Sequence, residues 1–174
     1  MDVSIETLTR SDWDVVRSIY LQGIATGEAT FEMDVPTFDE WDSSHLPGCR
    51  LVARQEEEIV GWAALSPVSR RCVYRGVAEV SIYIAASHRG EGVGKALMDA
   101  LIMLSEGEMI WTLESSMFPE NEASIRLHKA CGFREFGFRE KIAELDGKWR
   151  NTILMERRSK VIGRGAQDSI EADA

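Results

Sequence analysis

The sequence contains little proline, little cysteine and no long apolar run. Of its 174 residues only 4 are Pro and 3 are Cys, whereas 44% are hydrophobic and 28% are charged. This composition excludes collagen-like and disordered chains and is typical of a globular protein with a packed core. No segment approaches the roughly 18 apolar residues of a membrane span, and Asp2 and Glu6 stand where a secretory signal has basic residues. We therefore expect a protein that is neither inserted into a membrane nor exported.

Basic residues are fewer than acidic ones. The chain has 20 Lys and Arg against 29 Asp and Glu, which gives a formal net charge of −9. Nucleic acids and anionic membranes are held mainly by clustered Lys and Arg, so this balance argues against both as partners. Cationic and zwitterionic small molecules stay open as substrates.

The three cysteines, Cys49, Cys72 and Cys131, are widely spaced. An odd set of this kind cannot form a complete disulfide framework, and it contains no Cys-x-x-Cys metal pattern. These features favour a reducing, cytoplasmic location. The length is typical of one domain, which we predict over residues 1–158, followed over residues 159–174 by a tail of low apolar content.

The spacing of apolar residues predicts an α/β domain in which strands and helices alternate. Strands are expected over residues 3–8, 51–53, 59–65, 77–84 and 109–113, and on both sides of the hairpin turn Asp146-Gly147. Helices are expected after Ser11, after Thr37, over residues 96–104 and after Asn121. In the strand over residues 77–84 the even-numbered side chains face the core, and the odd-numbered ones, including Glu79, face the other side.

A glycine-rich segment, Arg89-Gly90-Glu91-Gly92-Val93-Gly94-Lys95, follows this strand and precedes a predicted helix. Backbone N–H groups at a helix N-terminus favour anionic phosphate. The spacing does not fit a dinucleotide fingerprint, because its last glycine would fall at Lys95, nor a Walker A loop, which needs Ser or Thr at Ala96. What remains is Arg-x-x-Gly-x-Gly, for which an ordinary strand–helix turn is the alternative interpretation.

A second motif, Asn-x-x-Ser-x-x-Leu-His-x-x-x-Gly-Phe, runs from Asn121 to Phe133. In this order the two motifs resemble the GNAT family of acetyl-CoA-dependent N-acetyltransferases. Further segments resemble its phosphinothricin and methionine sulfoximine acetyltransferase subgroup, namely residues 29–32, 61–67, 71–74, 79–84 and 146–149. The resemblance covers roughly residues 5–156. It implies the GNAT fold, a mixed, mostly antiparallel twisted sheet with helices on both faces and splayed central strands, and it implies a homodimer.

The resemblance also implies where acetyl-CoA binds. The glycine-rich loop would wrap the pyrophosphate through its backbone amides, and the main chain of the splayed strand would pair with the pantetheine arm like an added strand. The expected cofactor-binding residues are Ile82, Tyr83, Ile84, Arg89, Gly90, Glu91, Gly92, Val93, Gly94, Lys95 and Asn121. Asn121 is expected to cap its helix as well.

Two side chains are candidates for catalysis. Glu79 matches the carboxylate of the subgroup that acts as general base toward the acceptor ammonium; the alternative is a surface Glu on a half-exposed strand. His128 stands where many family members have a Tyr that protonates the leaving thiolate, and as imidazolium it could take that role. The alternative for His128 is a histidine on the helix surface without a catalytic duty. Cys131 is expected to be a small core residue at the end of the same helix.

The acceptor site is less strongly marked in the sequence. The subgroup acetylates amino-acid-like molecules, whose carboxylate requires a cation. Arg71, or Arg75, with Tyr74 would supply it, and Cys72 and Val73 would line the pocket through their backbone. Phe31 and Glu32 would form the opposite wall. Ordinary loop structure is the alternative for each of these residues.

These features predict an N-acetyltransferase that needs no metal. It would transfer acetyl from acetyl-CoA to the amino group of a small amino-acid analogue such as methionine sulfoximine, methionine sulfone or phosphinothricin. Acetylation of a polyamine, an aminoglycoside or a protein amine is one alternative, which the acidic net charge would suit. An acetyl-CoA-binding regulatory domain without turnover is the other, and the presence of Glu79 argues against it.

Overall fold

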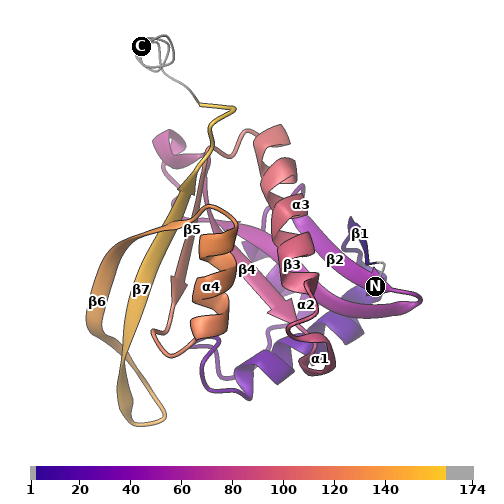
Figure 1. Ribbon diagram of the computed structural model, residues 1–174, viewed down its shortest axis with the longest axis horizontal. Coiled ribbons are helices and arrows are strands. Elements are labelled where there is room, and N and C mark those ends of the chain that lie inside the picture. The colour runs from indigo at the N-terminus through magenta and orange to yellow at the C-terminus, as the bar shows by residue number, and fades with distance from the viewer. Residues whose placement is uncertain (1–2, 164–174) are drawn as a thin grey trace.

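One sheet of seven strands runs through the structure, a computed structural model that describes residues 3–163 (Figure 1). Its strands are β1 (Ser4–Thr7), β2 (Arg50–Gln55), β3 (Glu58–Pro67), β4 (Val77–Ile84), β5 (Thr112–Met117), β6 (Arg134–Leu145) and β7 (Lys148–Arg158). In space they follow the order β1-β2-β3-β4-β5-β7-β6. Within this sheet β4 and β5 run parallel, and all other neighbours are antiparallel. The predicted mixed, mostly antiparallel sheet is confirmed.

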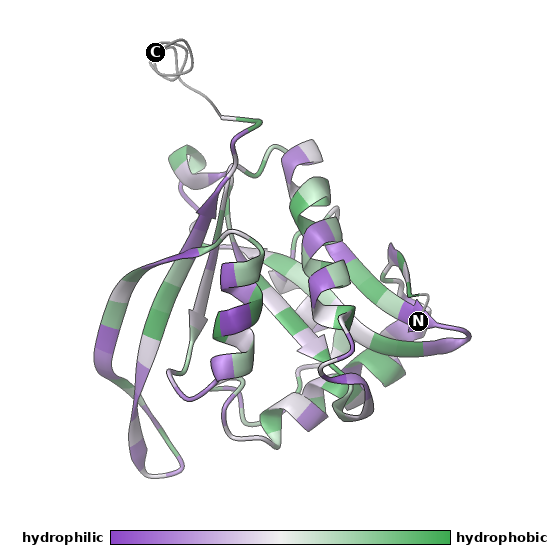
Figure 2. Ribbon diagram, in the orientation of Figure 1, coloured by the Kyte–Doolittle hydropathy of each residue, from purple (hydrophilic) through white to green (hydrophobic). Residues whose placement is uncertain are grey.

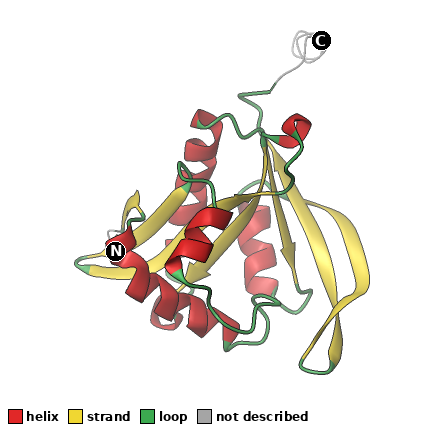
Figure 3. Ribbon diagram, turned by 180° about the vertical axis from the view of Figure 1, so that it is seen from behind, coloured by secondary structure: helices red, strands yellow, loops and turns green. Residues whose placement is uncertain are grey.

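Helices cover both faces of the sheet, as predicted. They are α1 (Trp13–Ile24), α2 (Phe38–Ser44), α3 (Val93–Gly107) and α4 (Glu122–Ala130). In Figure 1, α3 and α4 lie in front of the sheet, and the view from behind in Figure 3 shows α1 and α2 on the opposite face. Leu97 and Leu101 of α3 belong to the core on one face, and Val16 and Ile19 of α1 belong to the core on the other. Both faces of the central strands are therefore covered, and Figure 2 shows hydrophobic residues along them.

Local signals in the sequence determine several of these boundaries. Thr37 and Glu40 form the expected capping box at the start of α2, with the Thr37 backbone N–H donating to Glu40 at 2.9 Å. Asp146 and Gly147 both have positive φ, as the two-residue turn between β6 and β7 requires. The strand predicted over residues 77–84 is β4, with the same bounds.

Two predicted boundaries are wrong. The helix cap is not Ser11, because a 3-10 turn over Arg10–Asp12 precedes α1 and the Asp12 carboxylate accepts from the Thr9 backbone N–H at 2.8 Å. The strand predicted from Met109 begins at Thr112 instead. Met109 has a φ of 62°, and the Ile110 backbone N–H donates to the Ser105 carbonyl at 2.8 Å, so these residues close α3 before the strand begins.

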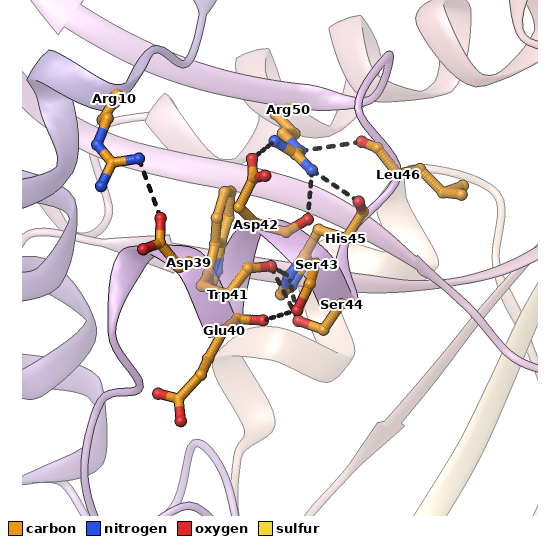
Figure 4. A network of polar contacts seen from close by, with 10 residues as sticks. All are labelled: Arg10, Asp39, Glu40, Trp41, Asp42, Ser43, Ser44, His45, Leu46 and Arg50. Atoms are coloured by element: carbon orange, nitrogen blue, oxygen red, sulfur yellow. Dashed lines mark hydrogen bonds and ion pairs between the residues drawn. The ribbon is translucent and has the colours of Figure 1, made fainter.

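A buried arginine at the start of β2 fixes α2 to the sheet (Figure 4). Arg50 of β2 is 9% exposed, forms an ion pair with Asp42, and donates to the carbonyls of Asp42 and His45 at 2.7 Å each. Its guanidinium lies over the Trp41 ring at 5.3 Å, and His45 stacks on the same ring at 4.3 Å. Since Arg50 satisfies carbonyls at the C-terminal end of α2, the helix is held without a capping glycine.

The chain leaves the sheet at Arg158 and turns back toward the end of α3. The Ser159 backbone N–H donates to the Trp111 carbonyl at 2.8 Å, and its hydroxyl donates to Glu106 at 2.8 Å. Residues 159–163 of the predicted tail follow directly after β7, and its residues 164–174 lie outside the described part of the chain. None of the helices formed by residues 3–163 is long and apolar enough to cross a membrane.

Candidate active site

The centre of the sheet opens into a wedge. The strands β4 and β5 pair only through Val77–Glu79 and Thr112–Glu114, and beyond these three pairs they are no longer hydrogen-bonded neighbours. A cavity of about 1060 Å³ lies at this opening. Residues of β4, β5, α4, the glycine-rich loop, the segment after α1 and the β6–β7 hairpin line it. The predicted splay of the central strands is therefore present, and it coincides with the large cavity.

The glycine-rich loop forms one end of the cavity. Gly90 and Gly92 have φ of 81° and 88°, where a glycine is favoured, and a Cβ at either would meet no atom within 4 Å. Gly94 is needed for a different reason, because a Cβ there would lie 3.1 Å from Leu127 of α4. The loop therefore leaves open space in front of the first turn of α3, where phosphate oxygens could approach backbone amides.

Most of the predicted coenzyme-binding residues meet at the cavity. Those that line it are Ile82, Tyr83, Ile84, Arg89, Gly90, Gly92, Gly94, Lys95 and Asn121. Glu91 and Val93 do not line it, and Val93 is 2% exposed in the core. The Asn121 amide caps α4 by accepting from the Ser124 backbone N–H at 3.2 Å, and it also donates to the Glu28 carbonyl at 3.2 Å. Asn121 thus ties α4 to the segment after α1.

His128, in the last turn of α4, is buried and is not a surface residue. It is 1% exposed, and its Nδ1 lies 2.8 Å from the Ser124 carbonyl, so Nδ1 carries the proton that forms this hydrogen bond. Its Nε2 has no hydrogen-bond partner among residues 3–163, and the residue lines the cavity. Burial lowers the pKa of His128, partly offset by the bond to Ser124. In this state Nε2 is an acceptor rather than an acid.

Glu79 stands at the closed end of the wedge, in the last pair that joins β4 to β5. Its side chain is exposed toward the cavity that it lines. Loss of surrounding water raises the pKa of Glu79 first, the negative charge of the paired Glu114 raises it further, and the positive charge of Arg139 opposes both. A carboxyl in this environment is suited to accept a proton.

Aromatic side chains form another part of the cavity wall. The Tyr83 ring stacks on Trp62 of β3 at 4.8 Å and packs against Tyr20 of α1 at 4.6 Å. Phe31 meets Phe118 edge-on at 4.8 Å, and both Phe31 and Glu32 line the cavity. Aromatic rings and carboxylates thus both contribute to the lining of the cavity.

The comparison with known families agrees with this architecture. The sequence model of the acetyltransferase (GNAT) family matches residues 13–133. The chain belongs to this family. The matched region contains the wedge strands, the glycine-rich loop and α4, so the features built above are those of a GNAT domain.

Individual relatives narrow the comparison. A phosphinothricin N-acetyltransferase of Alcaligenes faecalis is 32% identical over 162 residues, which cover 88% of this chain and 81% of that protein. An L-methionine sulfoximine/L-methionine sulfone acetyltransferase of Pseudomonas paraeruginosa is 24% identical, covering 90% and 94%. The crystal structure of a phosphinothricin acetyltransferase from Sinorhizobium meliloti in complex with AcCoA superposes with a TM-score of 0.82, at 26% identity, covering 96% and 92%.

The GNAT cavity does not include the residues predicted to hold the acceptor carboxylate. Arg71, Cys72, Val73 and Tyr74 lie on an exposed turn before β4, and none of them lines the cavity. Arg71 lies over the Tyr74 ring at 5.8 Å. Gly76, which follows the turn, lies so close to Trp111 that a Cβ would overlap its ring. Within this chain, binding of the acceptor by Arg71–Tyr74 stays a prediction that the cavity does not support.

Other cavity residues of this GNAT domain were not predicted. Arg139, Ile142 and Ala143 of β6 and Thr152 of β7 line the cavity. A register shift between Arg139 and Ala143, with Lys141 at a φ of 47°, distorts β6 at this point. Gly137 lies two residues before Arg139, but the shifted segment itself, residues 139–143, contains no glycine or proline that signals a bulge. Within residues 3–163 no cluster of His, Cys, Asp and Glu is arranged to hold a metal ion.

Proposed function

We propose that this GNAT domain transfers the acetyl group of acetyl-CoA to the amino group of a small amino-acid analogue of the phosphinothricin, methionine sulfoximine or methionine sulfone type. The observation that carries the proposal is the position of Glu79, at the apex of the wedge and in the same cavity as the glycine-rich loop. The names of the relatives point to the same acceptor class.

The residues around the wedge fit acetyl-CoA. Gly90 and Gly92 leave open space in front of the helix start, and the main chain of Ile82–Ile84 faces the gap left by β5. Loop amides and the helix dipole would hold the pyrophosphate, so a net charge of −9 is no obstacle to a polyanionic ligand. When bound, acetyl-CoA supplies an activated acetyl thioester.

Glu79 is proposed as the general base. The acceptor arrives as an ammonium ion and must lose a proton before its nitrogen can attack a carbonyl carbon. Glu79 takes this proton, directly or through one water, and the acetyl group passes from sulfur to nitrogen without an acyl-enzyme. The nitrogen loses its second proton as the amide forms, and the departing thiolate takes that proton. This step is not assigned to His128, because burial lowers the pKa of that side chain and Nδ1 donates to Ser124, which leaves Nε2 as an acceptor.

We expect kcat/KM for the acceptor to rise with pH along an acid limb set by Glu79. A general base acts only when ionised, and burial and Glu114 raise the pKa of this carboxyl. Activity is therefore lost as the pH falls through a value above the ordinary range of Glu. The acceptor ammonium titrates at higher pH and produces a separate limb. A pH profile at saturating acetyl-CoA measures both.

The control for this profile is Glu114→Gln. This substitution removes the negative charge that raises the pKa of Glu79, so the acid limb should move toward lower pH. If the acid limb of the pH profile were at the same pH in Glu114→Gln as in the wild type, a group other than Glu79 would determine it.

A thiol-release assay tests the function as a whole. Purified protein and acetyl-CoA are combined with phosphinothricin, methionine sulfoximine and methionine sulfone, and in parallel with a polyamine, an aminoglycoside and a peptide amine. We expect turnover with the amino-acid analogues and little with the others. Preference for the polyamine would refute the proposed acceptor, and acetyl-CoA binding without turnover of any amine would indicate a regulatory domain.

The cytoplasmic location and the homodimer stay predictions. Both come from the sequence and from its resemblance to the subgroup. Size-exclusion chromatography with light scattering would test the dimer on the full chain.

A further inference from the structure

We propose that Arg139 and Thr152, which lie side by side on the β6–β7 hairpin, form the subsite that binds the acceptor's carboxylate or an equivalent oxyanion. This inference rests on the proposed function, since it assigns the group that anchors the acceptor of that reaction. It places the residues that bind the acceptor's carboxylate on the β6–β7 hairpin, and not on the turn before β4.

The register of the hairpin places the two residues together. Arg139 of β6 and Thr152 of β7 are direct partners in an antiparallel pair. Side chains of such partners project from the same face of the sheet, with Cβ atoms about 5 Å apart. Both residues line the cavity, as does Ala143 beyond the bulge. The two side chains thus offer neighbouring donors to one ligand group.

Thr152 contributes a buried hydroxyl that lacks a partner. The residue is 3% exposed, and its Oγ1 forms no hydrogen bond with any atom of residues 3–163. A buried hydroxyl without a partner is unfavourable, and native proteins rarely leave one unsatisfied. A valine would fill the same space without burying a hydroxyl. The hydroxyl of Thr152 therefore requires a hydrogen-bond partner from a ligand or a bound water.

Arg139 contributes a guanidinium that has no ion-pair partner in the described part of the chain. Its neighbours on the hairpin differ. Arg134 is paired with Glu156, and Arg150 donates to the Gly27 carbonyl at 3.0 Å and lies over the Phe118 ring at 4.0 Å. Arg139 is close enough to Glu79 for its positive charge to lower the pKa of that carboxyl. An unpaired guanidinium on a cavity wall is suited to bidentate binding of a carboxylate.

The charges of the cavity are arranged for a zwitterion. Glu79, Glu32 and Glu28 line it near the wedge and the segment after α1, and Arg139 faces them from the hairpin. The other lining cations are Arg89 and Lys95 of the coenzyme loop and Arg126 of α4, which forms an ion pair with Glu122. An α-amino acid held with its carboxylate at Arg139 would direct its ammonium toward the carboxylates, where Glu79 takes the proton. A polyamine has no anion for this subsite.

The test compares two acceptors in several variants. Methionine sulfone carries the carboxylate, and its carboxamide keeps the amine without that charge. In wild-type enzyme we expect a higher kcat/KM for the acid. Arg139→Gln should lower kcat/KM for the acid by about 10- to 100-fold, the effect of losing a charge-assisted hydrogen bond. The same substitution should change kcat/KM for the carboxamide far less. Thr152→Val should lower it by roughly 2- to 10-fold.

The controls separate this effect from others. Arg134→Gln, on the same strand but outside the cavity, should leave both acceptors unchanged, and the KM for acetyl-CoA should stay the same in Arg139→Gln. Assays run at a pH well above the Glu79 limb, so that a shifted pKa does not imitate the result. The inference would be overturned if Arg139→Gln lowered kcat/KM equally for the acid and the amide, or lowered neither. It would also be overturned if Arg71→Gln abolished the preference for the acid while Arg139→Gln kept it. Absence of wild-type turnover with every amino-acid acceptor would overturn the proposed function and the inference together.

Discussion

Replacing Glu79 by Gln should lower kcat by about 10²- to 10⁴-fold, the range for loss of a general base. The amide cannot accept the proton of the acceptor ammonium, although it has nearly the size of the carboxylate. Glu79 makes one of the three pairs that join β4 to β5 through its backbone, which the substitution retains. Steady-state kinetics with the best acceptor from the thiol-release assay would measure the loss.

The coenzyme should still bind to this variant. Glu79 lies at the closed end of the wedge, and the glycine-rich loop forms another part of the cavity wall, so calorimetric titration with acetyl-CoA should give a nearly unchanged Kd. Glu58→Gln, an exposed position at the start of β3, serves as the matched control and should keep wild-type activity. An unchanged rate in Glu79→Gln would remove this residue from the mechanism.

Truncation of Trp62 to Ala should cost about 3–5 kcal/mol of the free energy of unfolding, the usual effect of emptying a buried aromatic site. Trp62 is 1% exposed and packs against the rings of Tyr83, Tyr20 and Trp41. Since Tyr83 stacks on it and lines the cavity, the variant should also lose order in the acceptor wall. Urea unfolding followed by circular dichroism would measure the change in stability.

Two further variants show whether packing is the cause. The indole N–H of Trp62 has no hydrogen-bond partner among residues 3–163, so Trp62→Phe removes an unsatisfied donor, keeps a ring in the stack, and should cost much less than Trp62→Ala. Trp149→Ala, in the β6–β7 hairpin, should change stability by about 0.5 kcal/mol or less, because that side chain is 61% exposed. Equal losses at Trp62 and Trp149 would contradict the packing argument.

Much of the fold follows from short-range signals. The alternation over residues 77–84, the Thr37–Glu40 capping box and the Asp146-Gly147 turn each determine a local conformation, and the structure has all three. The predicted start of β5 is three residues early. Ile110 and Trp111 are β-formers, but the Ile110 backbone N–H donates to Ser105 of α3 and the Trp111 backbone N–H donates to the Gly76 carbonyl, so the regular strand begins only at Thr112. Periodicity alone also did not determine what covers the face of β4 that carries Glu79. In the structure, Tyr20 of α1 packs against Tyr83 on that face.

The acceptor end of the site depends on contacts that are distant in sequence. The coenzyme loop is one continuous segment, so its residues could be recognised from their spacing. Arg139 reaches the cavity only because β7 lies between β5 and β6 in the sheet and β6 bulges after it. Neither the strand order nor the shift in residues 139–143 has a local signature, whereas the resemblance to the subgroup points to Arg71 or Arg75 in the turn before β4.

The narrow joint in the sheet links ligand binding to the stability of the fold. The half-sheets β1–β4 and β5–β7 share three residue pairs. A molecule lying in the wedge with contacts on both strands bridges these halves, and it binds the folded chain in preference to the unfolded one. By mass action, a ligand at 100 times its Kd adds about 2.7 kcal/mol to the free energy of unfolding. The concentration of that ligand in the cell is then one of the factors that keep this chain folded.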